Sequence, residues 1–322
     1  MEKWLRNLKY NPIAPLFESD NEAITAFARR DLLGEKVNLE KLWELPQVQK
    51  ILKKQRSDGS WKYPGASKDV LQDMYDQLET WRQLGYLVEM FGFAKKHQAV
   101  QKAAKCIFAH QSKDGDFRGI YAKQTSPNFS AAMAELLIKA GYENDSHIIK
   151  HFKWLLGTRQ NDSGWALAFR TRGYNLKVIY GNEPLIEPDP AKPSAWLITG
   201  AVLRAFAAHP KYRKSKEAKI AGELLAGKFF KRDSYPDMAA PEHWTKFTFP
   251  FDYTHLVSAL DSLSQLNISP DNPQIQKGLD WLIKNQQKDG LWNFRVVRGG
   301  GKSDYNLWLA LAVCRVFKKF YY

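Results

Sequence analysis

A short pattern that recurs four times in this 322-residue chain constrains its fold more than any other feature. In each copy a Gly follows a Gln by four positions, and an aromatic residue follows the Gly by one or two. Repetition of this kind is typical of folds that stack one supersecondary unit many times. The copies are QRSDGSW (Gln55 to Trp61), QSKDGDF (Gln111 to Phe117), QNDSGW (Gln160 to Trp165) and QQKDGLW (Gln286 to Trp292).

The spacing of the glycines predicts one further, degenerate copy. Gly59 and Gly115 are 56 residues apart and Gly115 and Gly164 are 49 apart, whereas Gly164 and Gly290 are 126 apart, which is two units of 63. The missing copy is expected between the last two, where KRDSYPDMAAPEHW (231–244) lies without the Gln and the Gly.

The segments between the copies are interpreted as pairs of helices, one charged and amphipathic and one more apolar. In IQKGLDWLIKNQ, for example, Ile275, Leu279 and Leu282 recur at helical spacing. Charged helices are expected at 2–9, 41–55, 97–110, 144–159, 212–230 and 272–286. Apolar helices are expected at 19–33, 75–92, 126–141, 193–208, 250–266 and 303–320.

This alternation predicts an all-α fold with two concentric rings and the apolar helices inside. We expect a single closed (α/α)6 toroid of helical hairpins, forming one domain over 1–322 with about six hairpin repeats, the fourth degenerate near 231–244. Closure requires residues 2–9 to pack beside 303–320. An open helical solenoid is the alternative.

The charge balance bears on the partners. Lys and Arg number 48 against 34 Asp and Glu, a formal net charge of +14, which favours an anionic partner such as a phosphorylated ligand or an acidic membrane surface bound peripherally. The lysines are spread over the charged helices, so no specific nucleic acid is predicted. With two cysteines, no disulfide framework is expected. No signal peptide and no 18-residue apolar stretch is readable, so a cytoplasmic location is expected.

The repeated copies resemble the QW-type repeats of the terpenoid cyclase/protein prenyltransferase α/α-toroid superfamily, and the resemblance runs from residue 40 to residue 320. Two further segments, KPSAWLITGAVLRAF (192–206) and FPFDYTHLVSALDSLSQLN (249–267), resemble uncharacterised prenyltransferase-like repeat proteins of bacteria and archaea. The resemblance implies a central, aromatic-lined cavity for an isoprenoid or other apolar-chain ligand, with or without an anionic head. The repeated Gln and aromatic residues are interpreted as structural staples at helix ends.

The catalytic clusters known in that superfamily are absent from the sequence. The chain has no Asp-Asp pair, which excludes both the DxDD acid and the DDxxD cluster that carries magnesium-diphosphate. Asp73-x-x-Asp76 is the nearest match, with a helix cap as the alternative. Neither Cys106 nor Cys314 has an Asp two residues before it, so the zinc site of the prenyltransferase β subunits is missing. We therefore predict no metal and no cofactor.

Polar side chains near the starts of the apolar helices are the candidate catalytic groups, because a closed ring would bring them to one mouth. Carboxylates, an imidazole and a phenol provide general acid and base groups, and aromatic and basic side chains bind ligands. The candidate catalytic residues are Asp252, His255, Asp73, Asp76, Asp304 and Tyr305. The candidate ligand-binding residues are Trp81, Trp196, His243, Trp244, Tyr253, Arg295, Arg298 and Trp308.

The Gly-rich turn at 299–303 is a separate candidate, because its backbone N–H groups with Arg295, Arg298 and Lys302 could hold an anion. The alternative is a flexible turn with solvated charges.

Three functions remain open. An isoprenoid-type transferase or cyclase-like enzyme is the leading interpretation. A non-catalytic toroid that binds a ligand or partner is the alternative, which the missing clusters favour. A glycan-active lyase or hydrolase on an (α/α)6 toroid is the second alternative, since aromatics and paired acids would suit a sugar. The sequence leaves substrate, reaction and oligomeric state open.

Overall fold

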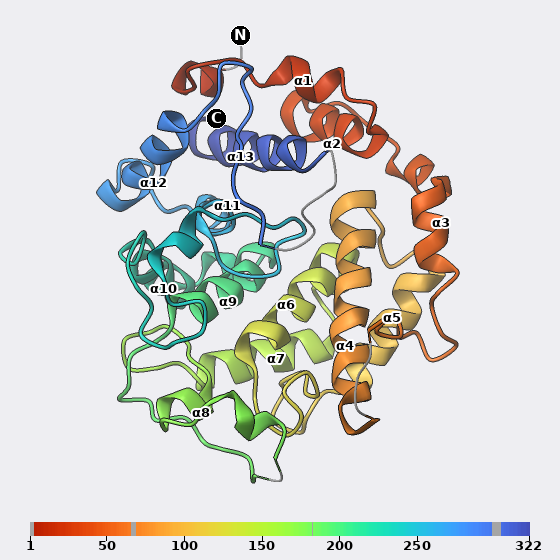
Figure 1. The fold of residues 1–322 in the computed structure, drawn as a ribbon, viewed down its shortest axis with the longest axis vertical. Coiled ribbons are helices and arrows are strands. Elements are labelled where there is room, and N and C mark those ends of the chain that lie inside the picture. Colours follow the sequence, from red (N-terminus) through yellow and green to blue (C-terminus); the bar gives the residue numbers. More distant parts are fainter. Residues whose placement is uncertain (1–2, 66–68, 182, 298–303) are drawn as a thin grey trace.

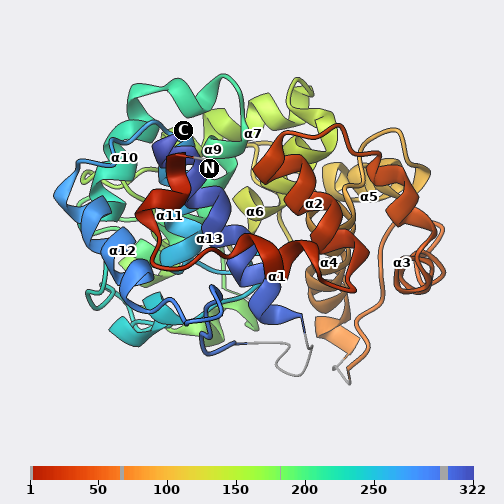
Figure 2. The ribbon, with the colours of Figure 1, turned by 90° about the horizontal axis from the view of Figure 1, so that it is seen from above.

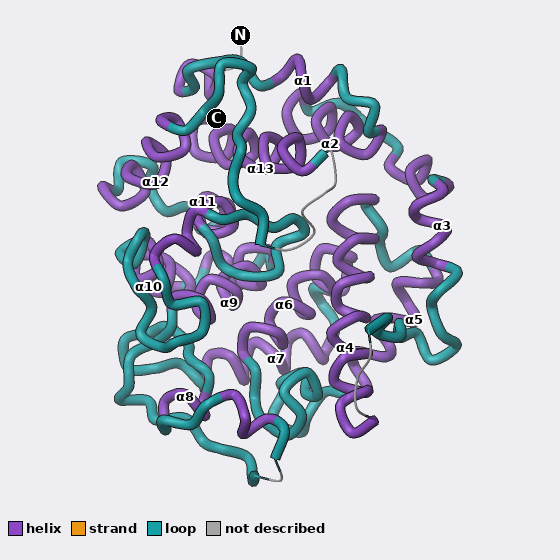
Figure 3. Tube along the Cα trace, viewed as in Figure 1, coloured by secondary structure: helices purple, strands orange, loops and turns teal. Residues whose placement is uncertain are grey.

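The computed structural model describes residues 3–65, 69–181, 183–297 and 304–322. Within these residues it contains helices, loops and isolated bridges, with no β-strand (Figure 3). Figure 1 shows longer helices around a centre and a second set of helices outside them. The predicted all-α toroid is therefore confirmed. None of the described helices combines the length and apolar character that crossing a bilayer requires.

Several helices of the inner ring are buried on nearly every side. In α9, for example, residues on all faces are buried, as expected for a helix enclosed between ring neighbours and an outer layer. Consecutive helices pack together from α4 through α6, α9, α11 and α13 to α2. The inner helices are α2 (Glu22–Leu33), α4 (Asp69–Gly85), α6 (Pro127–Leu137), α9 (Trp196–Ala208), α11 (Leu256–Gln265) and α13 (Tyr305–Tyr321).

The outer helices are amphipathic and turn one stripe to the inner ring. In α12 the buried residues Ile275, Gly278, Leu279 and Leu282 recur at i, i+3, i+4 and i+7. The outer helices are α3 (Pro46–Leu52), α5 (Gln98–Ala109), α7 (Ser146–Gly157), α10 (Lys216–Ala226) and α12 (Pro273–Lys284), and the shorter α1 (Ile13–Phe17) and α8 (Ala168–Thr171) complete the α-helices.

The N-terminal segment closes the ring against the last helix. The 3-10 helix η1 (Lys3–Asn7) packs on α13, and so does α1. Trp4 is completely buried there. Figures 1 and 2 both show this segment beside α13. The predicted packing of 2–9 against 303–320 is confirmed for the described residues.

Some predicted helix boundaries were wrong, for local reasons. The helix expected over 41–55 is split into a 3-10 turn η2 (Leu39–Glu44) and α3, because Pro46 keeps Leu45 extended (ψ 139°). The helix expected over 250–266 begins only at Leu256, where His255 caps it. The helix expected over 75–92 begins at Asp69 and continues into a π-helical turn, η3 (Tyr86–Met90).

The repeated glutamine joins each unit to another segment of the ring. Nε2 of Gln55 donates one hydrogen bond to the carbonyl of Gly59 in its own turn (3.0 Å) and another to the carbonyl of Ala99 in α5 (2.9 Å). The corresponding acceptors are Gly115 and His147 for Gln111, Gly290 and Tyr10 for Gln286, and Asp189 and Lys192 for Gln160. The last copy thus binds the N-terminal segment and closes the ring.

The repeated indole satisfies a backbone carbonyl near the end of the preceding outer helix. Nε1 of Trp61 donates to the carbonyl of Ile51, ten residues earlier, at 2.9 Å. Trp165 and Trp292 make the same bond to Leu155 and Leu282, both at 2.8 Å. In the degenerate copy, Trp244 donates to Lys231 at 3.2 Å. Helix ends leave carbonyls without intrahelical partners, so the predicted staple role is confirmed.

Replacing Gln286, whose hydrogen bonds to the N-terminal segment form the clasp of the ring, should lower the stability of the whole fold. Its amide donates to Tyr10 and Gly290 and accepts from the N–H groups of Lys9 and Tyr10. Because each of these four hydrogen bonds contributes about 1 kcal/mol net, Gln286→Ala should lower the free energy of unfolding by about 4 kcal/mol in a urea titration. The neighbouring exposed Gln287→Ala is the control and should change it by less than about 0.5 kcal/mol. If the two variants changed the free energy of unfolding equally, the hydrogen bonds of Gln286 would not hold the ring closed.

Candidate functional site

A cavity of about 810 Å3 lies between α4, α6, α13 and residues 248–252, and it extends outward to α3. Sites for small molecules usually occupy about 300 to 1,000 Å3. Gly85 lines the cavity on α4, and its missing side chain leaves room beside Leu136 of α6 and Pro250. The volume is therefore sufficient for a small organic ligand.

Aromatic side chains form much of the cavity wall. The rings of Phe249 and Trp308 are stacked with centroids 4.8 Å apart. Trp81 is only 5% exposed and packs edge-on against Phe129. Stacked and edge-on rings give a wall that is rigid as well as apolar. The aromatic lining residues are Trp81, Tyr86, Phe91, Phe249, Phe251, Tyr305 and Trp308.

Carboxylates interrupt this wall. Burial raises the pKa of Tyr86 and of Tyr305, and the charge of Asp252 adds to this effect at both phenols. Asp304 accepts a hydrogen bond from Nδ2 of Asn21 at 2.8 Å, which ties the start of α13 to the start of α2. The acidic lining residues are Glu79, Glu89, Glu135, Asp252 and Asp304.

Glu135 belongs to a buried network of ion pairs. Its Oε2 accepts from Nε of Arg204 on α9 at 2.9 Å, and its Oε1 accepts from Nζ of Lys139 at 2.7 Å. Lys139 also donates to Glu89 at 2.5 Å. Burial alone would raise the pKa of Glu135, but the two cations outweigh it and lower that pKa. Burial likewise opposes the charge of Lys139, and the carboxylates outweigh it and raise the pKa of the amine.

Five of the candidate residues meet at this cavity, namely Trp81, Asp252, Asp304, Tyr305 and Trp308. They come from α4, α13 and the segment before α11, which are distant in sequence. The hydroxyl of Tyr305 lies 3.4 Å from the Phe249 carbonyl, so the phenol is anchored to the same segment as Asp252.

Asp76 and Asp73 on α4 lie outside the cavity lining. Asp76 is buried and accepts from Nη1 of Arg56 at 2.7 Å and from the N–H of Tyr63 at 2.8 Å. It therefore ties α4 to the turn of the first repeat. Asp73 is exposed.

His255 lies at the start of α11 and also outside the cavity lining. It is completely buried, and its Nδ1 accepts from the N–H of Ser258 at 3.3 Å while Oγ of Ser258 accepts from the N–H of His255 at 3.0 Å. This arrangement is a capping box. Tyr253 is buried too, with its ring centroid 5.4 Å from that of His255.

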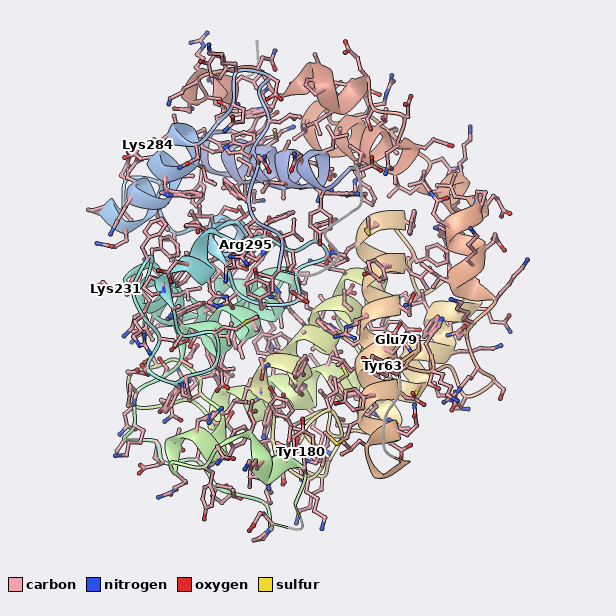
Figure 4. All side chains as sticks on the ribbon, viewed as in Figure 1. Tyr63, Glu79, Tyr180, Lys231, Lys284 and Arg295 are labelled. Atoms are coloured by element: carbon pink, nitrogen blue, oxygen red, sulfur yellow. The ribbon has the colours of Figure 1, made fainter. Side chains whose placement is uncertain are left out.

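The remaining candidate ligand-binding residues also lie away from the cavity lining. Trp196 and Trp244 are stacked on each other in the interior, with centroids 4.3 Å apart. His243 is half-buried in the 3-10 turn η7 (Pro241–Thr245). Arg295 is exposed on the segment between α12 and α13, where Figure 4 labels it. Arg298 and the Gly-rich turn at 299–303 lie outside the described residues.

The sequence analysis missed the polar residues that inner helices and α3 contribute to the cavity. Glu79 and Arg82 of α4 and Tyr86, the first residue of η3, recur at i, i+3 and i+7 within a segment that the sequence predicts as an apolar helix. This polar stripe was the available signal, and Figure 4 labels Glu79 on it. Lys50 and Lys54 reach the cavity from α3 and the residues after it. Among the described residues, no three potential metal ligands cluster together.

The burial of His255 predicts a loss of stability in mild acid. Burial, assisted by the charge of Arg204, lowers its pKa from 6.5 to about 3. The unfolded chain binds a proton below pH 6.5 and the folded chain does not, so stability that is complete above pH 6.5 falls by about 1.4 kcal/mol per pH unit towards pH 3. His255→Asn keeps a capping side chain. It should remove about 2 kcal/mol of the loss between pH 7 and pH 5, measured by urea unfolding at each pH.

The control for this pH dependence is the exposed His110→Asn, which should follow the wild-type profile. If His255→Asn lost as much stability as the wild type between pH 7 and pH 5, His255 would not be the neutral buried cap described here.

Comparisons with solved structures give distant similarities. The type II terpene cyclase MstE from Scytonema aligns in its apo form with a TM-score of 0.35 and 12% identity over 87% of this chain and 98% of that chain. A variant of that enzyme in complex with its substrate, geranylgeranyl dihydroxybenzoate, aligns with a TM-score of 0.35 and 13% identity over 88% and 97%. A protein from Actinoplanes aligns with a TM-score of 0.30 and 15% identity over 88% and 99%. No curated protein sequence matches significantly.

Comparison with protein families gives a more specific result. Residues 122–298, more than half of the chain, match the family model of the squalene-hopene cyclase C-terminal domain. The match begins before α6 and extends beyond α12, so it includes the segment 248–252 that lines the cavity. The chain therefore belongs to the squalene-hopene cyclase C-terminal domain family, within the terpenoid cyclase/prenyltransferase toroid superfamily.

Proposed function

We propose that the chain binds an isoprenoid or other apolar-chain ligand in the cavity and acts on it as an isoprenoid-type transferase or cyclase-like enzyme. The observation that carries this proposal is the aromatic wall of the cavity, interrupted by the carboxylates of Asp252 and Asp304. The family supports it, since it is named for an enzyme of squalene, an isoprenoid hydrocarbon.

The lining suggests how the site would work on such a ligand. Apolar chains bind by losing their contact with water against Trp81, Phe249 and Trp308. The faces of the same rings attract positive charge that develops on a carbon chain. Asp252 is the candidate for exchanging a proton with the ligand, because it lies near the phenols of Tyr86 and Tyr305.

A bulky side chain at Gly85 should abolish binding. A Cβ there would sit 3.7 Å from Cδ1 of Leu136 and 3.8 Å from Cβ of Pro250, so Ala fits and a larger side chain competes with the ligand. We expect Gly85→Phe to weaken binding of farnesol and geranylgeraniol at least tenfold, measured by quenching of tryptophan fluorescence, while Gly85→Ala binds as the wild type does.

The surface control for this substitution is Gly157→Phe, on the exposed end of α7 with no atom within 4 Å of its Cβ. It should bind like the wild type. Circular dichroism and thermal unfolding identify any variant that fails to fold. Wild-type affinity in a folded Gly85→Phe protein, or no affinity in the wild type, would contradict the proposed ligand class.

The proposed role of Asp252 separates an enzyme from a binding protein. Asp252→Asn keeps the size of the side chain and removes its basicity, so it should lower conversion of a ligand by about a hundredfold or more while binding changes little. Products are measured by gas chromatography with mass spectrometry after incubation with farnesyl and geranylgeranyl substrates. If the wild type returned every bound ligand unchanged, the non-catalytic alternative would replace the enzyme.

A further inference from the structure

The cavity reaches the outside through a seam in the inner ring. Within the described residues, α2 and α4 are the neighbouring inner helices that scarcely touch, whereas the other neighbours pack together. Figure 1 shows α3 on the outer side of this part of the ring. The cavity lining includes Gln47, Lys50, Ile51 and Lys54, all from α3 or just after it. The cavity therefore continues sideways between the rings rather than ending at the inner helices.

Two helical stripes face this opening. On the α3 side the lining residues Gln47, Lys50, Ile51 and Lys54 recur at i, i+3, i+4 and i+7. On α4 and the start of η3, Glu79, Arg82, Gln83 and Tyr86 have the same spacing. Residues at this spacing share one face of a helix. Both faces are mostly polar, which suits a solvated mouth rather than a packed helix interface.

Two lysines carry positive charge at the mouth, although five carboxylates also line the cavity. Lys50 and Lys54 are exposed, and within the described part of the chain neither forms an ion pair. Of the other charged lining residues, Arg82 lies 3.7 Å from Glu79, and Glu89 and Glu135 pair with Lys139, which lies outside the lining. Asp304 accepts a hydrogen bond from Asn21, and Asp252 is a further carboxylate of the lining. The lysines therefore leave a local positive charge at the outer end of an aromatic cavity.

We propose that Lys50 and Lys54 form a head-group subsite for an anionic group, a phosphate or a carboxylate, at one end of an apolar-chain ligand. The subsite rests on the proposed function, because the chain of that ligand occupies the aromatic cavity. The ligand enters between α2 and α4 with its apolar end first and reaches Trp81, Phe249 and Trp308. Its head stays at the mouth, where flexible ammonium groups bind an anion as point charges.

The opposite direction of entry is closed by the ionic network. Glu135 lies at the inner boundary of the cavity, 4% exposed, and Arg204 behind it is 3% exposed. An anionic head at Glu135 would meet a carboxylate, and moving it past Arg204 would break a buried ion pair at high cost. Charge therefore orients the ligand with its head at α3.

The test compares ligands that share one chain and differ in the head. Farnesyl phosphate, farnesoic acid and farnesol are titrated against the wild type, Lys50→Gln/Lys54→Gln, and the control Lys41→Gln/Lys53→Gln. The control removes the same charge from exposed lysines outside the cavity lining. We expect the wild type and the control to bind at least one anionic probe about tenfold more tightly than farnesol, and the first variant to lose that preference. Raising the salt concentration should weaken the preference in the wild type and the control alone.

The outcomes separate the subsite from the proposed function. If farnesol binds and the anionic preference is absent, or is retained in Lys50→Gln/Lys54→Gln, the head-group subsite is wrong and the proposed ligand class stands. If no probe with a farnesyl chain binds, the proposed function fails and the subsite with it. A preference for farnesyl phosphate over farnesoic acid assigns the head as phosphate, and the reverse preference assigns it as carboxylate.

Discussion

The hydrogen bonds of the repeated glutamine amide hold the ring together. Each amide joins a turn to a backbone carbonyl elsewhere in the chain, and in the copies with Gly59, Gly115 and Gly290 a close approach of backbone accompanies it. At Gly59 a Cβ would lie 2.2 Å from the carbonyl oxygen of Lys102, and at Gly290 it would lie 2.5 Å from that of Asn11. Both glycines have positive φ, 92° and 85°. Only Gly fits there, which explains the recurrence of Gly after Gln in these copies. At Gly164 a Cβ would instead meet the side chain of Ser194, with Oγ at 2.4 Å.

Ring closure also determines where a cavity can exist. The inner helices pack in turn from α4 to α2, and the last clasp binds the N-terminal segment at Tyr10. The seam between α2 and α4 is therefore the place where the ring is joined least tightly, and the cavity extends towards it. The lining residues that α4 and α3 contribute at this seam are mostly polar, whereas Phe249 and Trp308 form an apolar wall in the interior.

The sequence predicted the fold better than the site because the two depend on different information. Glycine spacing and helical periodicity are local, and they were sufficient for the paired helices, the two rings and the closure. The site depends on which side of each helix end a side chain occupies. Asp252 and His255 are three residues apart, yet the first lines the cavity and the second caps α11. Glu135 and Lys139 are four residues apart and so local in sequence, whereas only the folded ring brings Arg204 of α9 to Glu135.

Under the proposed function, the acids of the cavity lining differ in whether they can exchange a proton, because their neighbours differ. Lys139 and Arg204 lower the pKa of Glu135, so this carboxylate stays ionised and cannot supply a proton at neutral pH. Asp304 accepts from Asn21 and so has a role in joining α13 to α2. Burial raises the pKa of Tyr86 and Tyr305, so these phenols remain protonated and act as hydrogen-bond donors. Glu79 lies 3.7 Å from Arg82, and Glu89 pairs with Lys139. Under the proposed function Asp252, the remaining carboxylate of the lining, is therefore the candidate for proton exchange, and the charge of Glu135 repels an anionic head.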